Sequence, residues 1–311
     1  MKKIVMLFAT VAISASVAFA QDVNSVIEIY NNGIMQLEAG DKKAALESFQ
    51  IALTEAEILG EPGATVAENC KASIPAVMLS IANDGIDAKD YDTALEYLAK
   101  AEEAAKLYGD TTKAASAKAK AGQVLMVKAN EFLKAKDYAG AINVYSQIMA
   151  ADSTNANAAL RLGQCYAATG DNDNAEAALT IAAANGQEKQ ANKQLSTIYV
   201  KKAAAALKEN KTQDAFNFAV KSNEFVENAN AVKIAGQCAM KLGKTADAIP
   251  YLEKYVELSP NAKDANQMRF NIAATAQKLG QKEKAKAYYQ QVLTDPSLGA
   301  KAKQQLDALN K

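Results

Sequence analysis

A spacing that recurs along the chain constrains its fold more than any other feature. A small residue is followed by Ala twelve positions later and, four positions further on, usually by a large apolar residue. Residues three or four apart share one face of an α-helix, so the spacing predicts two helices folded back on each other around a turn. Seven copies occur: Gly33/Ala45/Phe49, Ala82/Ala94/Leu98, Ala129/Ala141/Tyr145, Gly163/Ala175/Leu179, Ala203/Ala215/Ala219, Gly236/Ala248/Leu252 and Ala273/Ala285/Tyr289.

The fourth copy, Leu160–Ala182, shows how one unit is expected to fold. Gly163 and Ala175 are small where the two helices must come closest. Gly170 suits the left-handed conformation that ends a helix, and Asp171 suits the cap of the next helix. A single hairpin cannot bury its own apolar face, so each copy needs neighbours on both sides.

This order resembles the tetratricopeptide repeat, a helix–turn–helix unit of about 34 residues. The resemblance rests on the seven copies, on turns such as Gly40-Asp41, and on Pro260 and Pro296 near the position of the family's closing proline. The Ala-to-Ala spacings are 49, 47, 34, 40, 33 and 37 residues, and the family's Trp is missing. Over residues 24–295 the resemblance implies an all-α, right-handed superhelical solenoid of about seven repeats.

The chain is expected to divide into a leader, a repeat array and a cap. Residues 1–20 read as a signal peptide, with Lys2 and Lys3 before an apolar run and Ala18-Phe19-Ala20 as the cleavage motif. The array then covers 21–296, and 297–311 forms a C-terminal capping helix. An exported protein follows, periplasmic in a bacterium with two membranes and otherwise secreted. We expect no transmembrane segment after signal cleavage.

Two long spacings near the start predict insertions. Pro62-Gly63 should interrupt the helical pattern after Leu59, and a further helix should begin near Lys113. Pro250 is expected in the first turn or two of its helix, where a missing N–H matters least.

The amino-acid composition argues against most kinds of catalytic, metal-binding and nucleic-acid-binding site. The chain has no histidine, so Ser-His and Cys-His pairs and His-based zinc sites cannot form. The formal net charge is zero and no basic block occurs, which argues against nucleic-acid binding. We therefore expect no catalytic residues, no metal and no cofactor. Cys70, Cys165 and Cys238 are interpreted as buried small apolar residues, with a reactive or intermolecular thiol as the alternative.

The remaining candidate is a surface. In the family, the first helices of successive repeats line a concave groove that meets peptides. Carried onto this chain, that face comprises Asn83, Met126, Asn130, Arg161, Gln164, Lys201, Lys233, Gln237, Phe270 and Asn271. Amides can pair with the backbone of an extended peptide, and cations can hold acidic groups. Lys233, Gln237 and Asn271 resemble part of the family's clamp for a terminal carboxylate. The alternative is an ordinary solvated helix face.

The leading hypothesis is a non-catalytic scaffold or adaptor that binds a peptide or partner protein along this groove in the cell envelope. The alternative is a structural subunit of an envelope assembly that acts through self-association. An enzyme is the third and most distant possibility. The sequence does not identify the partner.

Overall fold

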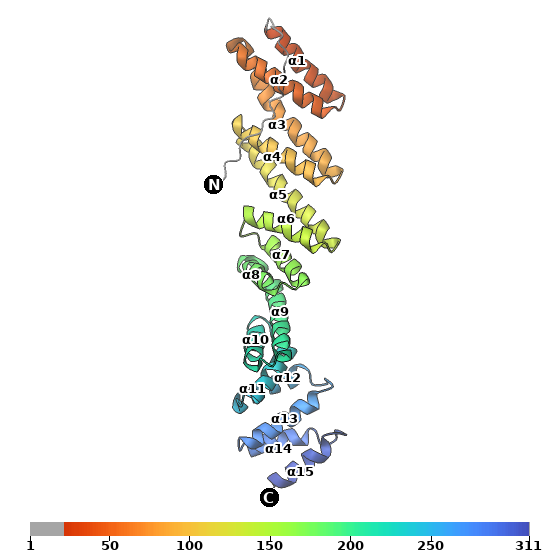
Figure 1. Cartoon of the computed structure of the whole chain (residues 1–311), viewed down its shortest axis with the longest axis vertical. Helices are drawn as coiled ribbons and strands as arrows, with labels where there is room; N and C mark the ends of the chain where they lie inside the picture. Colours follow the sequence, from red (N-terminus) through yellow and green to blue (C-terminus); the bar gives the residue numbers. More distant parts are fainter. Residues whose placement is uncertain (1–21, 311) are drawn as a thin grey trace. The chain divides into compact units, whose positions relative to one another are not determined.

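The computed structural model describes residues 22–310, and the expected signal peptide lies outside this range. Every regular element in the described range is helical, so the all-α prediction is confirmed. The first helices of the seven hairpins are α1 (Val23–Glu38), α3 (Ala64–Asp87), α5 (Thr111–Lys134), α7 (Ala156–Thr169), α9 (Glu188–Lys208), α11 (Ala229–Lys241) and α13 (Ala265–Lys278). The second helices are α2 (Lys42–Leu59), α4 (Tyr91–Leu107), α6 (Tyr138–Ala151), α8 (Asn172–Ala182), α10 (Thr212–Phe225), α12 (Thr245–Leu258) and α14 (Lys282–Gln290), and α15 (Gly299–Leu309) follows (Figure 1).

The recurring Ala lies at the closest approach of the two helices in every hairpin. All seven alanines have an exposed fraction of 0%, and the residues four positions later are at most 1% exposed. Gly163 shows why the partner position is small. A Cβ added there would lie 2.6 Å from Leu179 Cγ and 3.2 Å from the Ala175 carbonyl oxygen. The spacing therefore marks the residues that pack between the two helices of each hairpin, which we call the seam, as predicted.

The turns inside the hairpins share one backbone conformation. Gly170 has φ 86°, and the Asp171 N–H donates to the Tyr166 carbonyl at 2.9 Å, which closes α7. Lys89, Lys136 and Asn210 take the same left-handed conformation without being glycine. Because glycine is the residue that adopts this conformation freely, the sequence did not mark these three turns as left-handed.

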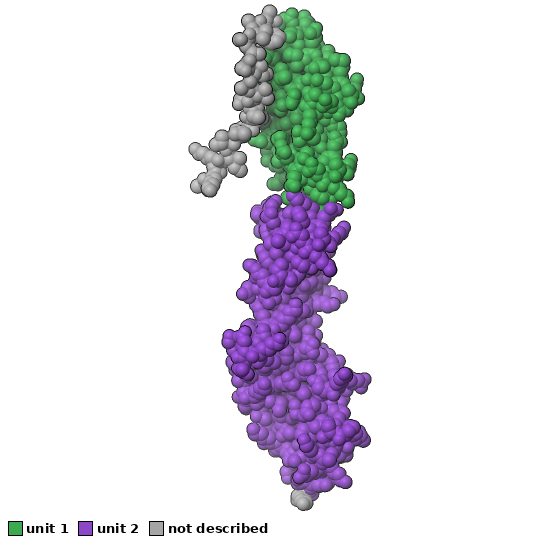
Figure 2. Space-filling view, turned by 45° about the vertical axis from the view of Figure 1, so that its right-hand side comes forward, with its two compact units in different colours: residues 1–127 green, residues 128–311 purple. Residues whose placement is uncertain are grey.

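The described helices form two compact units, divided between residues 127 and 128 (Figure 2). Unit 1 holds α1 to α4 and the first part of α5, and unit 2 holds the end of α5 and the helices up to α15. Inside each unit, consecutive helices pack against one another. The right-handed superhelix over the whole array stays a prediction.

The long spacings arise from longer helices and short inserted turns. Helix α2 ends at Leu59, a 3₁₀ turn covers Glu61–Gly63, and α3 then runs for 24 residues with Pro75 inside it. The second insertion produces the 24-residue α5. The sequence did not predict the kink at Asn185 and Gly186, where the backbone leaves the helical conformation and Gly186 has φ 105°, just before the 21-residue α9.

The C-terminal helix and the three cysteines follow the sequence prediction. Helix α15 buries Ala302 and Leu306 in the same core cluster as Tyr289. Cys70, Cys165 and Cys238 are unpaired and fully buried, and burial raises the pKa of Cys70 and of Cys165 to about 11. Burial and the raised pKa make these thiols poor nucleophiles. In the described part of the chain, no helix is both long and apolar enough to cross a membrane.

Candidate partner-binding face

The predicted face lies on first helices from α3 to α13, and none of its eight polar members is buried. Four of them come directly after the small residue of their hairpin, in the copies that begin with Ala82, Ala129, Gly163 and Gly236. These four side chains are all amides: Asn83, Asn130, Gln164 and Gln237. Asn83 is the one member in unit 1, where its Oδ1 accepts a hydrogen bond from Lys120 Nζ.

Asn130 has a structural partner that the sequence did not reveal. Its Oδ1 accepts a 2.7 Å hydrogen bond from the Tyr145 hydroxyl, and Tyr145 is fully buried. Burial raises the pKa of Tyr145 to about 12, so the hydroxyl keeps its proton and donates. The Asn130 amide group remains as a donor for a ligand.

Arg161 and Gln164 lie together on α7. Arg161 Nη1 donates to Gln164 Oε1 at 3.1 Å. This bond fixes which end of the Gln164 amide faces the guanidinium. Lys201 is exposed on α9.

Lys233 already holds a carboxylate of its own chain. Its Nζ lies 3.0 Å from Asp264 Oδ2 and 5.2 Å from the centre of the Tyr255 ring. The Tyr255 hydroxyl donates to Asp264 Oδ1 at 2.5 Å. The bonds from Tyr255 and Lys233 lower the pKa of Asp264, while burial raises the pKa of Tyr255 to about 12. A terminal carboxylate of a peptide would have to displace Asp264 from this lysine.

Gln237 and Asn271 converge from successive first helices on Met268. Gln237 Nε2 lies 3.9 Å and Asn271 Nδ2 lies 4.0 Å from the Met268 sulfur. A thioether is a weak acceptor, so both amide groups would gain from a carbonyl oxygen in its place. The structure thus brings these two members of the expected clamp together. The two apolar members of the predicted face are Met126, which is partly buried, and Phe270, whose ring meets the Tyr289 ring edge-on at 5.3 Å.

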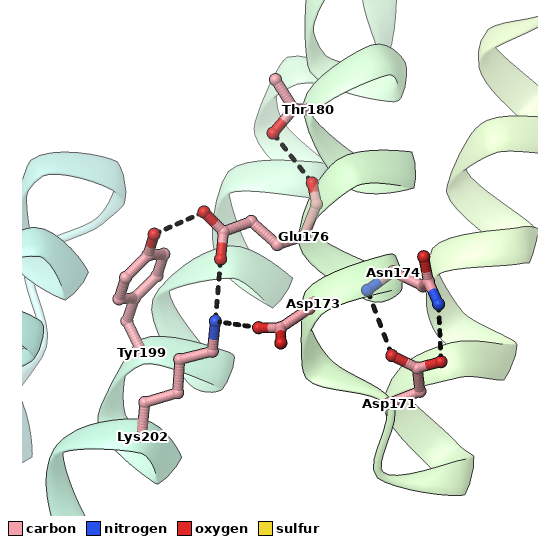
Figure 3. A network of polar contacts seen from close by, with 7 residues as sticks. All are labelled: Asp171, Asp173, Asn174, Glu176, Thr180, Tyr199 and Lys202. Carbon is pink, nitrogen blue, oxygen red and sulfur yellow. Dashed lines mark hydrogen bonds and ion pairs between the residues drawn. The ribbon is translucent and has the colours of Figure 1, made fainter. Parts of the chain in front are cut away.

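An ion-pair network between α8 and α9 was missed by sequence reasoning (Figure 3). Lys202 Nζ lies 2.9 Å from both Asp173 Oδ1 and Glu176 Oε2, and the Tyr199 hydroxyl donates to Glu176 Oε1 at 2.5 Å. The hydrogen bond from Lys202 lowers the pKa of Asp173.

One signal in the sequence marked this network. Glu176 directly follows the recurring Ala, where five other copies carry Leu46, Leu95, Ile142, Phe216 and Ile249. The seventh copy carries Lys286, so the position is apolar in five of the seven copies, and a charge there calls for a partner. Lys202, next to the predicted Lys201, is that partner.

The face is equipped to hydrogen-bond and to hold charge. Among residues 22–310, no group of three or more His, Cys, Asp or Glu side chains could hold a metal ion. The arrangement offers amide donors and acceptors along successive helices, which matches the needs of a peptide backbone.

Comparison with known proteins places the repeats in a family. Three family models, each described as a tetratricopeptide repeat, match residues 132–197, 201–263 and 267–294. A search of curated proteins gave no significant match.

Solved structures with similar folds include two tetratricopeptide-type proteins. MamA is 20% identical over 58% of this chain and 94% of its own, with a TM-score of 0.36. YrrB, described as a TPR protein with an unusual peptide-binding site, is 18% identical over 58% of this chain and 91% of its own, with a TM-score of 0.35. With its seven helical hairpins and the three family matches, the chain belongs to the tetratricopeptide repeat family.

Proposed function

We propose that this protein is a non-catalytic adaptor of the cell envelope that binds an extended peptide segment of a partner protein along the first helices of unit 2. Tetratricopeptide repeats serve as protein–protein interaction scaffolds, which supports the general function. The peptide and the envelope location are the parts that this proposal adds.

The convergence of Gln237 and Asn271 carries the proposal. Two amide nitrogens from neighbouring repeats point at one place, where each lies 3.9 or 4.0 Å from the Met268 sulfur, while Asn271 Oδ1 accepts from Gln267 Nε2 at 3.0 Å. A peptide carbonyl would give each a stronger hydrogen bond, worth about 0.5–1.5 kcal/mol. Gln164 and Asn130 extend the row of amides toward α5.

The contacts of each residue determine which substitutions can test the face without also disturbing the fold. Asn130→Ala would leave the buried Tyr145 hydroxyl without its partner, and Lys233→Ala would remove one of the groups that hold Asp264. Both changes would disturb folding as well as binding. Gln237→Ala combined with Asn271→Ala removes the amides without removing a partner from a buried polar group.

The test begins with a displayed library of random peptides selected on the immobilised full chain. Affinity of the selected peptides is then measured for the wild type and for the Gln237→Ala/Asn271→Ala variant. Loss of two hydrogen bonds should weaken binding by about tenfold or more. The matched control is Asn143→Ala/Gln147→Ala, which removes two exposed amides from the second helix α6. If both variants weakened peptide binding equally, or if no peptide could be selected, the proposed peptide-binding face would be refuted.

The envelope location rests on the sequence of residues 1–20. Expression in a bacterium with two membranes, followed by cell fractionation and mass spectrometry, tests it. We expect a periplasmic chain that begins at Gln21. A full-length chain in the cytoplasm would contradict the location without touching the peptide proposal.

A further inference from the structure

The two units carry opposite net charges. Residues 22–127 contain 17 acidic and nine basic side chains, a net charge of −8. Residues 128–310 contain 18 acidic and 23 basic side chains, a net charge of +5. The formal charge of zero for the whole chain hides this separation. Opposite potentials of this size steer association between surfaces.

One repeat position changes sign between the units. Five residues after the small residue, at the last position of the first helix, unit 1 has Glu38 and Asp87. Unit 2 has lysines in four of its five copies: Lys134, Lys208, Lys241 and Lys278. The C-terminal end of a helix carries partial negative charge, which favours the lysines and disfavours the acids. Helix stability therefore does not account for Glu38 and Asp87.

The cap of the second helix is Asp in both hairpins of unit 1 and in two of the five hairpins of unit 2, where it is Asp137 and Asp171. Asp41 and Asp90 cap α2 and α4, and each accepts from a backbone N–H at 3.1 Å. The equivalent residues of α10 and α12 are Lys211 and Lys244, which cap nothing. Losing a cap costs about 1 kcal/mol, and a cation at this end opposes the helix dipole. Neither lysine caps its own helix; Lys211 pairs with Glu209, and Lys244 Nζ lies 5.0 Å from the centre of the Phe216 ring.

Both positions lie at the turn inside the hairpin, and successive turns touch within a unit. Lys42 of the first hairpin bonds Asp84 of the second at 2.6 Å, and Lys244 of the sixth bonds Gln213 of the fifth at 3.3 Å. In each unit, side chains near the turns therefore link at least one pair of neighbouring hairpins. We call Glu38, Asp41, Asp87 and Asp90 the anionic turn edge, and Lys208, Lys241, Lys244 and Lys278 the cationic turn edge. All eight side chains are exposed. Lys211 is left out because it already pairs with Glu209 at 2.7 Å.

We propose that the anionic turn edge of one molecule binds the cationic turn edge of a second copy, head to tail. The two edges have opposite charge and lie at the turns of the same kind of hairpin. A contact between two different surfaces of identical chains leaves one edge of each kind free, and further copies can add to it. The edges adjoin the amide row, since Asp87 and Lys241 lie four residues after Asn83 and Gln237 on the same helices. The two proposals are separated by their readouts, which are self-association for the edges and peptide affinity for the amides.

The first test is self-association of the full chain at two salt concentrations, by sedimentation velocity. The screening length is about 30 Å at 10 mM salt and about 3 Å at 1 M. We expect concentration-dependent dimers and larger species at the low salt and monomers at the high salt. A wild type that stays monomeric at low salt, or associates equally at both, overturns the proposal.

Charge reversal supplies the second test. One variant carries Glu38→Lys and Asp87→Lys, and the other carries Lys241→Glu and Lys278→Glu. Each alone should associate at least about tenfold more weakly than the wild type, because the substituted edge then carries two charges of each sign and no net charge. Mixed together they should form a heterodimer, because the first variant keeps an unchanged cationic edge and the second keeps an unchanged anionic edge. Misfolded variants would not recover on mixing.

The matched control is Lys301→Glu/Lys303→Glu on α15, which changes the net charge equally but lies outside both edges. It should associate like the wild type. Weakening equal to that of Lys241→Glu/Lys278→Glu would show a response to net charge alone, and failure of the mixed variants to associate would show that the edges do not pair. Either result overturns the proposal.

Discussion

Ala175 lies where α7 and α8 cross, with no exposed surface and with Gly163 opposite it. A larger side chain there must push the helices apart or adopt a strained rotamer. Ala175→Leu should lower the free energy of unfolding by about 1–3 kcal/mol. Chemical denaturation followed by circular dichroism measures it.

The control for this residue is Lys282→Ala, an exposed change expected to shift stability by less than about 0.5 kcal/mol. An unchanged midpoint for Ala175→Leu would contradict the placement of Ala175 at the seam.

Single residues also show what the sequence could and could not predict. Ala175 was predictable because its position recurs in seven copies, so its spacing alone marks the seam. The partners of Asn130 and Lys233 were not, because Tyr145 and Asp264 come from other helices and only packing brings them near. The face was located by analogy between copies, whereas the bonds that each member makes depend on neighbours that differ from copy to copy.

At the scale of one element, four second helices have an Asp cap and three do not. Asp41, Asp90, Asp137 and Asp171 accept from their helix, whereas Lys211, Lys244 and Gln281 make no such bond. Gln281→Asp should restore the bond at α14 and raise stability by about 0.5–1 kcal/mol. Thermal unfolding of this variant beside Gln281→Ala measures the gain; equal melting temperatures would mean that no cap forms.

The segment before α15 should give the C-terminal cap a dependence on pH. Asp295 accepts from Asn266 Nδ2 at 2.9 Å, from Ser297 Oγ at 2.7 Å and N at 2.9 Å, and from Leu298 N at 3.1 Å. These bonds lower the pKa of Asp295 from 3.8 to about 2. Their contribution is full above the unfolded pKa and is lost as pH falls through the folded one.

Asp295→Asn imitates the protonated acid and tests this dependence. We expect it to melt below the wild type near pH 7 and to approach the wild type as pH falls from about 4 toward 2. A difference that stays constant with pH would show that the charge of Asp295 does not stabilise the cap.

At the scale of the whole molecule, stability should be local. Each hairpin packs mainly against its sequence neighbours, and the contacts divide the chain into two units. In Ala175→Leu, amide hydrogen exchange should accelerate in α7, α8 and α9 while α1 and α2 keep their wild-type rates. Acceleration in every helix alike would mean that the array unfolds as one cooperative body.

The array as a whole was predictable from its repetition, and its irregular places were not. Seven hairpins and a final helix could be predicted because the same spacing of small and apolar residues recurs in each copy. The kink at Asn185 and Gly186 and the Glu176–Lys202 pair occur once, so no other copy of the repeat predicts them. The charged residues were visible in the sequence. Their difference between two units could be seen only once the structure had divided the chain at residue 127.

The three buried thiols can report local opening of the fold. Cys70 lies in α3 of unit 1, and Cys165 and Cys238 lie in α7 and α11 of unit 2. None is accessible in the closed fold, so an alkylating reagent reaches each one only when its own helix opens. The order in which the three cysteines are alkylated in native buffer therefore shows which part of the array opens most readily. The measurement needs no engineered probe.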